Sequence, residues 1–447
     1  MNAASKSAST SRDLVLGLGA TGLSIARYLR RNDCDAVFID SRAEPPGIDE
    51  LNNVWPGADI KLGTSRLPTK VRRVIVSPGI EDSNELLAKA RKKNLEVVSD
   101  IEVFAREAKA PFVAITGSNG KSTVTTLLYH MCRAAGRTVL AGGNLGEPAL
   151  DLLDAEQPDI YVLELSSFQL HRTATLAAEV AVLLNVSSDH LDWHADEDEY
   201  RRSKYRVYRE AHAAVVNRAD GEAAECAKAI DKVITFGLDE PEDGQYGIRR
   251  EEEDVYLARG DTLLIATTDM AMVGLHNQAN TLAALAAGEL LGLETAAMLQ
   301  VISEFPGLPH RMQLVARKGA VNYINDSKAT NVAAAVASIE SVPGNIVLLA
   351  GGDGKGGDFA ELAAVLEGKL RAAVLIGKDA EAIANAIDTV MPVYFARDMD
   401  DAVCQAAVYA ESDDTVLLAP ACASLDQYDN YGARGDAFSA AVEALSG

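Results

Sequence analysis

Short runs of aliphatic and β-branched residues alternate along the chain with Ala- and Leu-rich stretches of helical spacing. Typical apolar runs span residues 74–76, 112–115 and 161–163, and a Gly-rich or polar turn follows each of them. Wholly apolar runs of this length are typical of strands buried on both faces, and their alternation with helices indicates parallel sheets covered by helices. The pattern therefore predicts an α/β protein.

Three blocks can be separated along the chain, at residues 1–99, 100–306 and 307–447. The first begins with a strand and a Gly-rich turn, the second has its first strong strand at 112–115, and the third follows the helical stretch at 283–291. The charged stretch 239–254 is typical of a surface hairpin or loop within the second block. We expect three domains, in keeping with the length of the chain.

Distinctive polar or glycine residues follow the ends of several predicted strands. They are Asp40, Ser77, Glu164, Asp326 and Gly351. In open parallel sheets, ligands bind beyond the carboxyl ends of the strands. Such ends in all three blocks predict a large composite ligand, or several ligands.

The net charge of the chain and the spacing of its cysteines limit the classes of function that the protein could have. Among 447 residues, 65 are acidic and 42 are basic, which gives a net charge of −23. This balance argues against general binding of nucleic acid or anionic membranes, although backbone amides and a local lysine still allow an anionic ligand. No apolar run approaches the roughly 18 residues that a transmembrane helix needs. We interpret the first twelve residues as a flexible leader. Five scattered cysteines without CxxC spacing indicate reduced thiols in a cytoplasmic protein.

The first Gly-rich turn carries Gly17, Gly19 and Gly22, and Asp40 ends the next predicted strand. This is the dinucleotide fingerprint in its βαβ context, where glycines let a pyrophosphate approach a helix N-terminus. The spacing to Asp40 suits a contact to a ribose or a base. The motif does not separate NAD from a UDP-sugar, and a tight turn without a ligand is the alternative.

A second Gly-rich loop spans residues 116–123 and reads TGSNGKST. In a P-loop, Lys121 would reach the β- and γ-phosphates of ATP, and Ser122 would ligate Mg²⁺. The strict GxxxxGK[ST] pattern fails because its first glycine falls on Ile115, so a chance match is the alternative. The flanking strand and helix favour ATP binding. A dehydrogenase would need the first loop but has no use for this one.

Candidate metal ligands lie in the second block. Glu164, at a strand end, suits the acidic partner of a P-loop, which holds Mg²⁺ directly or through water. His190 and His194 would share one face if they lay on a helix, but no third zinc ligand has metal spacing. We favour a loop histidine near Mg²⁺ and phosphates, with a surface histidine as the alternative. By composition alone, Lys204 reads as a surface lysine.

In the third block, Arg311 offers a guanidinium for phosphate oxygens. Lys328 and Lys355 stand beside small or hydroxyl residues at strand ends, where a carboxylate-bearing substrate could be held. Cys422 has no local histidine partner, so we interpret it as a small buried residue and not as a nucleophile.

Together, these motifs resemble the Mur ligase family over essentially the whole chain after the leader. The strings that carry the resemblance are TGSNGKST, ELSSFQL, NVSSDHLD, HNQAN, GLPHR, NDSKATN, GGDGKGGDF and PACASLDQ. The P-loop without its first glycine is the form that this family uses. The combination of NDSKATN and ELSSFQL resembles the members that add D-glutamate.

The resemblance implies an ATP-dependent amide ligase of three domains. Residues 1–99 would form a Rossmann-like domain that binds the UDP substrate, residues 100–306 a central P-loop ATPase-like domain, and residues 307–447 a Rossmann-like domain that binds the amino acid. The enzyme would add D-glutamate to UDP-N-acetylmuramoyl-L-alanine through an acyl phosphate, in peptidoglycan precursor synthesis. We expect it to act as a cytoplasmic monomer.

The resemblance also assigns residues to each ligand. The UDP contacts are Ala20, Thr21, Asp40, Ser41, Arg42, Ser77 and Gly79, and the acyl-sugar contacts are Asn144, Ser166 and Gln169. ATP would be bound by Gly117, Ser118, Asn119, Gly120, Lys121, Ser122, Thr123, Asn277, Asn280, Arg311 and Asp326. The D-glutamate pocket would comprise Thr330, Lys355, Ser424 and Tyr431, with Lys328 beside it. Ser41 and Tyr431 stand where other members often have Thr and Phe.

The implied catalytic residues are Lys121, His190, Lys204, Arg311 and Asp326. Two Mg²⁺ ions would be held by Ser122, Glu164 and His190, together with Lys204. In this family the lysine matching Lys204 is carbamylated by CO₂, which turns a cation into an anionic group that helps to hold Mg²⁺.

Three alternatives remain open at this point. The first is another Mur-type or a folylpolyglutamate-type ligase. The second is an NAD(P)-dependent oxidoreductase, which leaves the second loop and NDSKATN unexplained. The third is a non-catalytic nucleotide-binding regulator, which is disfavoured because Lys121, Ser122, Glu164, His190 and Lys204 are all present.

Overall fold

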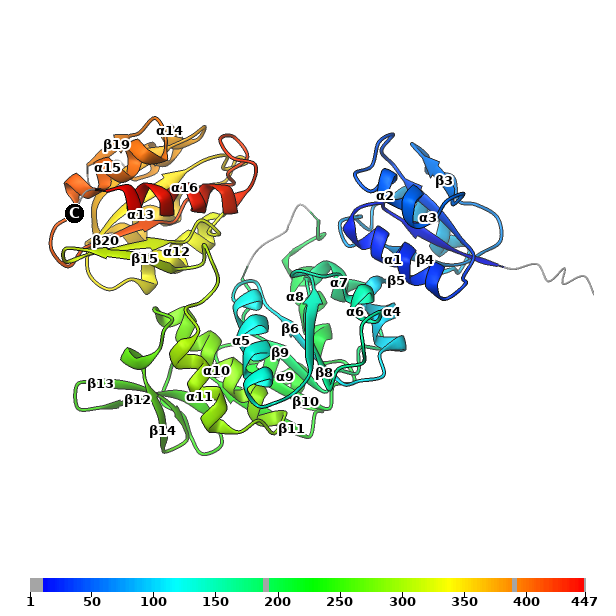
Figure 1. The fold of residues 1–447 in the computed structure, drawn as a ribbon, viewed down its shortest axis with the longest axis horizontal. Helices are drawn as coiled ribbons and strands as arrows, with labels where there is room; N and C mark the ends of the chain where they lie inside the picture. The colour runs from blue at the N-terminus through cyan, green and yellow to red at the C-terminus, as the bar shows by residue number, and fades with distance from the viewer. Residues whose placement is uncertain (1–10, 188–192, 388–391, 446–447) are drawn as a thin grey trace, which may run out of the picture. The chain divides into compact units, whose positions relative to one another are not determined.

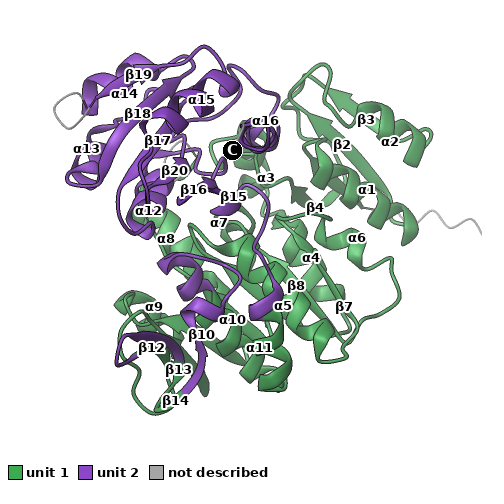
Figure 2. Ribbon diagram, turned by 60° about the vertical axis from the view of Figure 1, so that its left-hand side comes forward, with its two compact units in different colours: residues 1–249, 258–262, 281–301 green, residues 250–257, 263–280, 302–447 purple. Residues whose placement is uncertain are grey.

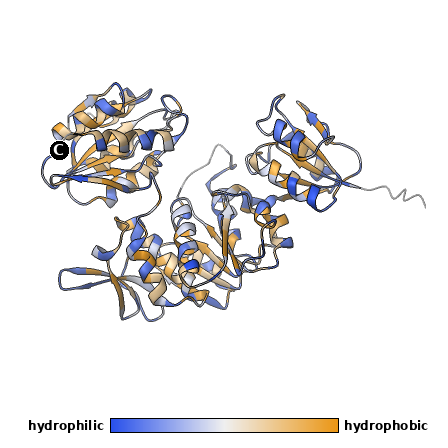
Figure 3. Ribbon diagram, in the orientation of Figure 1, coloured by the Kyte–Doolittle hydropathy of each residue, from blue (hydrophilic) through white to orange (hydrophobic). Residues whose placement is uncertain are grey.

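Three separate β-sheets, flanked by helices, make up the computed structural model, which describes residues 11–187, 193–387 and 392–445 (Figure 1). The sheets have five, nine and six strands. The predicted α/β class with three sheets is confirmed. Many of the strands are drawn in the apolar colour in Figure 3, in line with burial on both faces.

The first sheet has the strand order β3-β2-β1-β4-β5, and each neighbouring pair is parallel. Its strands are β1 (Arg12–Leu16), β2 (Ala36–Asp40), β3 (Asp59–Leu62), β4 (Val71–Val76) and β5 (Glu96–Ser99). The helices between them are α1 (Ala20–Arg31), α2 (Ile48–Val54) and α3 (Glu85–Lys92). This is a Rossmann-like arrangement, so both the first Gly-rich loop and Asp40 lie at the carboxyl edge.

The second sheet has the order β14-β13-β12-β11-β10-β9-β6-β8-β7. Its strands are β6 (Phe112–Thr116), β7 (Val139–Gly143), β8 (Ile160–Glu164), β9 (Val180–Leu183), β10 (Ala213–Asn217), β11 (Lys232–Phe236), β12 (Tyr246–Glu251), β13 (Asp254–Arg259) and β14 (Thr262–Ala266). The charged stretch expected to form a surface hairpin contributes β12 and the start of β13.

Eight α-helices accompany this sheet in the described part of the chain. They are α4 (Asp100–Glu107), α5 (Lys121–Ala134), α6 (Ala149–Leu152), α7 (Ser167–His171), α8 (Glu197–Tyr205), α9 (Gly221–Ala227), α10 (Leu275–Leu290) and α11 (Thr295–Glu304). Short 3₁₀ turns are η1 (Arg206–Tyr208) and η2 (Thr267–Asp269). The sequence pattern predicts a third block from residue 307, after the helical stretch 283–291, whereas the structure has a further helix, α11, between the two.

The third sheet has the order β15-β16-β20-β17-β18-β19, in which only the edge strand β15 is antiparallel to its neighbour. Its strands are β15 (Gln313–Lys318), β16 (Val321–Asn325), β17 (Ile346–Gly351), β18 (Leu370–Ile376), β19 (Val393–Phe395) and β20 (Thr415–Leu418). The helices are α12 (Val332–Ser341), α13 (Ala360–Leu366), α14 (Ala380–Ile387), α15 (Met399–Tyr409) and α16 (Tyr431–Ala444).

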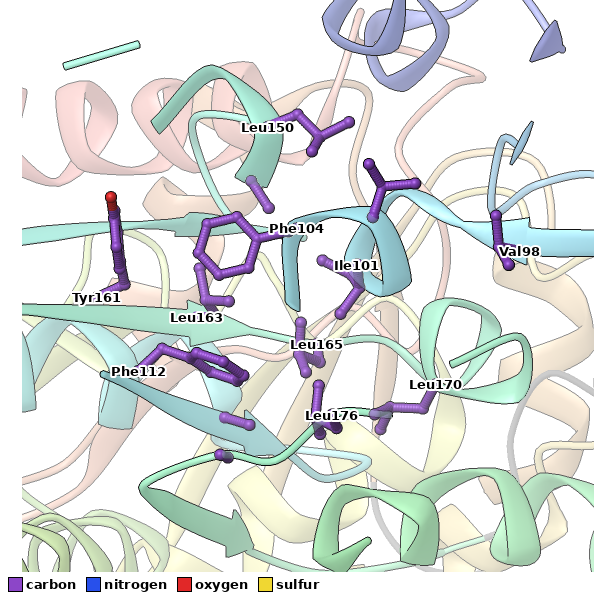
Figure 4. Close-up of a cluster of buried hydrophobic side chains, with 14 of the residues drawn as sticks. Val98, Ile101, Phe104, Phe112, Leu150, Tyr161, Leu163, Leu165, Leu170 and Leu176 are labelled. Carbon is purple, nitrogen blue, oxygen red and sulfur yellow. The ribbon is translucent and has the colours of Figure 1, made fainter. Parts of the chain in front are cut away.

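One buried cluster joins the last strand of the first sheet, α4 and the second sheet (Figure 4). Phe104 of α4 makes edge-on contacts with Phe112 of β6 and Tyr161 of β8, with ring centroids 5.7 and 5.2 Å apart. Val98 and Ile101 continue the cluster toward β5. Edge-to-face aromatic pairs at these distances add to the stabilisation that burial provides.

The chain divides into two compact units (Figure 2). The first comprises residues 1–249, 258–262 and 281–301, and the second comprises 250–257, 263–280 and 302–447. Across the described residues, no helix is both long and apolar enough to cross a membrane.

Candidate functional site

The second Gly-rich loop lies where three parallel strands end side by side. β6 runs between β8 and β9, so the loop after β6 lies between Glu164, at the end of β8, and Asn185, which follows β9. Glu164, noted in the sequence as a polar residue at a strand end, therefore lies at the same edge of the sheet as the second Gly-rich loop.

Backbone hydrogen bonds give the loop a fixed shape. The Ser118 N–H donates to the Asn185 carbonyl at 2.9 Å, and the Asn119 N–H donates to Asn185 Oδ1 at 2.8 Å. Gly120 has φ = +85°, which lets the chain turn directly into α5 at Lys121. The N-terminus of α5 thereby presents its backbone amides and the positive end of the helix dipole, as anion-binding loops do.

Two lysines converge on one carbonyl of this loop. Lys121 Nζ donates to the Gly117 carbonyl at 2.8 Å and to the Ser118 carbonyl at 2.9 Å, and Lys204 Nζ donates to the same Gly117 carbonyl at 2.7 Å. Lys204 is 2% exposed and also lies over the ring of Tyr200. The reading of Lys204 as a surface lysine is therefore wrong, because α8 buries it against a loop far away in sequence.

A buried carboxylate completes this edge. Glu164 is 2% exposed, and its Oε1 accepts a hydrogen bond from Asn144 Nδ2 at 2.7 Å. Its Oε2 has no hydrogen-bond partner among the described residues. A buried carboxylate oxygen without a donor suits a cation, and Ser122, buried at the start of α5, offers a hydroxyl of the type that Mg²⁺ accepts. His190 lies outside the described residues.

Ser166 and Gln169, expected at the acyl sugar, form a capping box at the start of α7. The Gln169 N–H donates to Ser166 Oγ at 3.2 Å, and the Ser166 N–H donates to Gln169 Oε1 at 3.1 Å. Gln169 Nε2 also donates to Asp100 Oδ2 at 3.2 Å. Burial raises the pKa of Asp100 to about 6, against the opposing effect of this hydrogen bond. These residues therefore already have structural roles, and their contact with a substrate remains a prediction.

The first Gly-rich loop is packed tightly. A Cβ on Gly22 would lie 2.0 Å from the Gly17 carbonyl oxygen, and one on Gly17, which has φ = +98°, would lie 2.7 Å from Ser77 Oγ. Ser77 Oγ itself donates to the Gly17 carbonyl at 3.2 Å. The two glycines therefore bring the loop, α1 and the end of β4 together, as the fingerprint requires.

The carboxylate of Asp40 holds this loop in place through hydrogen bonds. Its Oδ2 accepts from the Leu18 N–H at 2.8 Å, and its Oδ1 accepts from the backbone and side chain of Arg42, both at 2.9 Å. Burial disfavours the charged form, but these hydrogen bonds outweigh it and lower the pKa of Asp40 to about 2. The direct contact of Asp40 with a ribose or base remains a prediction.

A pocket of about 220 Å³ opens at the carboxyl edge of the first sheet. Ser41 lines it, together with Leu16, Gly63, Thr64, Ser65, Ile80, Asn84 and Leu86. Ala20 and Thr21 form the first turn of α1, and Gly79 is exposed in the loop after β4. The pocket therefore contains one of the predicted UDP contacts.

Several polar residues also lie close together beside the third sheet. Asp326, directly after β16, accepts from the Met312 N–H at 3.2 Å and from the hydroxyl of Ser338. Burial raises the pKa of Asp326 to about 6, although these hydrogen bonds and the charges of Arg311 and Lys328 act in the opposite direction. Asp326 and Arg311, both assigned to ATP, are thus brought within electrostatic reach of each other.

The predicted amino-acid residues are distributed around the same edge. Lys328 Nζ lies 4.5 Å from the ring centroid of Tyr431, at the start of α16. Ser424 is buried after β20, while Lys355 is exposed after β17 and has φ = +51°. Thr330 is partly exposed just before α12. The structure therefore brings Lys328 and Tyr431 into contact.

Arg434 was not singled out from the sequence. It is 1% exposed, and its guanidinium donates to Ser327 Oγ at 3.0 Å and to the carbonyls of Ser327, Cys422 and Gly351, at 2.8, 3.1 and 3.4 Å. Burial lowers its pKa to about 10. One side chain thus connects the loops after β16 and β20 with the end of β17. The only sequence signal was an arginine in the first turn of an Ala-rich helix.

Cys422 and the two asparagines of HNQAN complete the set of predicted residues. Cys422 is fully buried, and burial raises the pKa of its thiol to about 12, which supports a packing role. Asn277 Nδ2 donates to the Val273 carbonyl at 2.8 Å, and Asn280 Nδ2 donates to Asn277 Oδ1 at 3.3 Å. Their part in nucleotide binding remains a prediction.

His194 also differs from expectation. It lies in a bend before α8 and not on a helix, so helical spacing from His190 does not apply to it. Its described neighbours include His171 and Glu199, which no motif connected with it.

Comparison with protein families assigns a known description to each of the three sheets. "Mur ligase MurD-like, N-terminal domain" matches residues 11–99, "Mur ligase middle domain" matches 115–288, and "Mur ligase, glutamate ligase domain" matches 310–422.

Curated relatives are similar over nearly the full length. The chain is 46% identical over 436 residues to the UDP-N-acetylmuramoylalanine--D-glutamate ligase of Nitrosococcus oceani, which covers 97% of this chain and 96% of that protein. It is 45% identical over 441 residues to the protein of the same name from Legionella pneumophila, with 97% and 99% covered.

Solved structures share the fold at low identity. MurF ligase from Thermotoga maritima in complex with ADP superposes with a TM-score of 0.62 at 18% identity, over 98% of this chain and 99% of that one. A pseudomurein peptide ligase type C from Methanothermus fervidus gives a TM-score of 0.58 at 19% identity, over 97% and 100%. These likenesses support the architecture.

Proposed function

The chain belongs to the Mur ligase family, and we propose that it joins D-glutamate to UDP-N-acetylmuramoyl-L-alanine with consumption of ATP, in peptidoglycan precursor synthesis. The observation that carries the proposal is the edge of the second sheet. At this edge lie the second Gly-rich loop, the buried carboxylate of Glu164, and two lysines that donate to one carbonyl. The relatives that match nearly the full length of the chain are named UDP-N-acetylmuramoylalanine--D-glutamate ligase.

The reaction needs activation because a carboxylate is a poor electrophile. Transfer of the γ-phosphoryl group of ATP to the terminal carboxylate of UDP-N-acetylmuramoyl-L-alanine gives an acyl phosphate and ADP. The amine of D-glutamate then attacks the acyl carbon, loses a proton and expels phosphate, which leaves an amide.

The residues of the phosphate loop stabilise charge during the first step. We assign the ATP phosphates to the backbone amides of residues 117–123, at the N-terminus of α5. Lys121 would exchange its loop carbonyls for phosphate oxygens and place its charge on the transferring group, with Arg311 as a second cation. Asn277, Asn280 and Asp326 complete the proposed nucleotide contacts.

The residues present fit a magnesium site, since one buried carboxylate oxygen of Glu164 accepts no hydrogen bond from any residue that the structure describes. Ser122, Glu164 and His190 would hold two Mg²⁺ ions, together with a carbamate on Lys204. When bound, Mg²⁺ neutralises negative charge on phosphate oxygens. A carbamate would also place an anion beside Lys121, where two cations now share the Gly117 carbonyl.

The other substrates are assigned to the two outer sheets. We propose that residues 1–99 bind the UDP moiety, that 100–306 bind ATP, and that 307–447 bind the amino acid. The UDP contacts would be Ala20, Thr21, Asp40, Ser41, Arg42, Ser77 and Gly79, and the acyl-sugar contacts Asn144, Ser166 and Gln169. D-Glutamate would meet Thr330, Lys355, Ser424 and Tyr431, with Lys328 beside them. We further propose a cytoplasmic monomer, and the five free thiols support that compartment.

Phosphate release tests the function directly. We expect release only when ATP, UDP-N-acetylmuramoyl-L-alanine and D-glutamate are all present, and far less with L-glutamate, D-alanine or diaminopimelate. Equal release with diaminopimelate would favour another Mur-type ligase, and release with a folate would favour the folylpolyglutamate type. Saturable quenching of nicotinamide fluorescence without any phosphate release would instead favour the oxidoreductase.

A further inference from the structure

Two histidines and a glutamate that no motif connects meet beside α7 and α8. His171 ends α7, His194 lies in the bend before α8, and Glu199 lies in the first turns of α8. One potential ligand atom from each of the three lies within 4.8 Å of the other two. The His194 side chain is fully buried, and those of His171 and Glu199 are 12% and 30% exposed, so an ion could reach the cluster from one side.

Hydrogen bonds orient both imidazole rings in the same way. His171 Nε2 lies 3.0 Å from Asp82 Oδ2, and His194 Nε2 lies 3.0 Å from Ser167 Oγ. With the Nε2 protons donated to these oxygens, the lone pair of each ring is on Nδ1, which is the atom through which each histidine would bind a metal. A carboxylate that accepts the outer N–H of a histidine is the usual second partner of a metal-bound imidazole.

The Nδ1 atoms face α8. His194 Nδ1 lies 3.5 Å from Glu199 Oε2, longer than a good hydrogen bond. His171 Nδ1 lies 3.0 Å from Ser203 Oγ, one helical turn beyond Glu199. Ser203 can give up this contact, because its hydroxyl has the Glu199 carbonyl as an acceptor at 2.7 Å.

Aromatic side chains surround the cluster. The Trp193 ring lies 4.5 Å from that of His194 and 5.4 Å from that of His171, and Phe168 and Tyr200 contact His194 from other directions. Such surroundings restrict the access of solvent and lower the local dielectric around the cluster. They also place a fluorescent indole beside the two imidazoles.

We propose that His171, His194 and Glu199 form a site for Zn²⁺ or a similar transition-metal ion, with water as the fourth ligand. Two imidazoles and a carboxylate match the donor set of zinc sites with an open position, whereas Mg²⁺ prefers oxygen ligands alone. Tetrahedral zinc at about 2.0–2.1 Å from its ligands needs small side-chain movements from the present spacing. Binding replaces the His171–Ser203 contact by a metal–nitrogen bond and involves no change of oxidation state.

The position of the site gives it a consequence for the phosphate loop. The ion would link α7 to α8, and α8 also carries Lys204 and Tyr200, whose hydroxyl lies 2.7 Å from Ser118 Oγ. Zinc would therefore brace the helix that supports the loop. The site shares no ligand with the proposed Mg²⁺ residues, and the inference does not depend on the proposed function.

Direct metal binding tests the proposal on the full chain. Chelator-stripped protein is titrated with Zn²⁺ in competition with a chromophoric chelator, with excess Mg²⁺ present to fill sites that prefer hard cations. We expect one Zn²⁺ per chain that His171→Ala and His194→Ala each weaken by more than about 100-fold, the upper end for loss of an outer partner. Asp82→Asn should weaken binding less, by about 10- to 100-fold. His212→Ala, which changes an exposed histidine paired with Glu179, should have no effect.

A spectroscopic measurement locates the ion. In Trp55→Phe protein, Trp193 is the only tryptophan, so Co²⁺ should quench its fluorescence and develop the visible bands of a tetrahedral complex. Zn²⁺ should reverse both signals. Circular dichroism of the metal-free variants establishes that they are folded. Absence of zinc binding, or equal binding by the folded His171→Ala/His194→Ala double variant, would overturn the proposal.

Discussion

The two Gly-rich loops start from similar sequences but are built differently. In the first, Gly17 and Gly22 leave no room for a Cβ beside the Ser77 side chain and the Gly17 carbonyl, respectively. The nearby charges of Asp40 and Arg42 neutralise each other. In the second, the loop donates a hydrogen bond to Asn185, and its Gly117 carbonyl accepts hydrogen bonds from both Lys121 and Lys204. Close steric packing therefore determines the structure of the first loop, whereas a concentration of positive charge distinguishes the second. The first is thus suited to holding a ligand and the second to stabilising a reaction.

The largest expected effect concerns the charge of the second loop. Lys121→Ala should lower kcat by about 10³-fold with a smaller change in KM, because a charge on the transferring phosphoryl group acts mainly in the transition state. Steady-state phosphate release measures both constants. Lys228→Ala, which removes an exposed lysine paired with Glu225, serves as the control and should retain the wild-type rate. A Lys121→Ala enzyme with normal kcat would remove the distinction between the loops.

The next effect concerns the shape of the first loop. Gly22→Ala should lower the free energy of unfolding by about 3 kcal/mol and raise KM for the UDP substrate, since its Cβ would lie 2.0 Å from a backbone oxygen. Gly19→Ala is the matched control, because nothing lies within 4 Å of a Cβ there. Denaturant unfolding and substrate titration provide the two readouts. Equal stability of the two variants would contradict the close packing.

Asp100, at the start of the second block, should make stability depend on pH in one direction. Its pKa is raised to about 6 in the folded protein, so the folded state binds more protons than the unfolded state between about pH 4 and 6. Its contribution therefore favours folding at low pH and is lost as pH rises through 6, by at most about 3 kcal/mol. Asp100→Asn should remove this loss. Its unfolding free energy relative to wild type should be higher at pH 8 than at pH 4.5, and an unchanged difference would count against the buried acid.

Asp40, in the first loop, should show the opposite dependence with a smaller size. Its pKa is lowered to about 2, so its contribution is present above about pH 4 and is lost as pH falls through 2. Asp40→Asn should cost about 2 kcal/mol at pH 7 and progressively less toward pH 2. Chemical denaturation across this range measures the trend. A penalty independent of pH would mean that the Arg42 and Leu18 contacts do not depend on the charge.

Features encoded over short distances could be predicted from the sequence. Both Gly-rich loops and the strand ends at Glu164 and Asp326 could be predicted from apolar runs and turn residues, because these depend on the local conformation of the backbone. The resemblance then supplied the proposed roles of Lys204 and Tyr431, which no local pattern indicates.

Features made by distant segments could not be predicted. The burial of Lys204 depends on a contact with Gly117, 87 residues away, and Arg434 contacts Ser327 across 107 residues. The cluster of His171, His194 and Glu199 likewise needs α7 and α8 to pack together. Periodicity and motif spacing describe neighbours along the chain, so they do not report such contacts.

The buried guanidinium of Arg434 has a consequence for motion in the third sheet. Ser327 and Cys422 lie in the loops after β16 and β20, and Gly351 is the last residue of β17, directly before the third loop. All three place oxygens on this one group. If one loop opens, the guanidinium loses part of its solvation shell of carbonyls, and the other two loops lose their shared donor. Amide hydrogens of the three loops should therefore exchange with solvent at closely matched rates, as a single cooperative unit, although some 95 residues separate the first loop from the last along the chain.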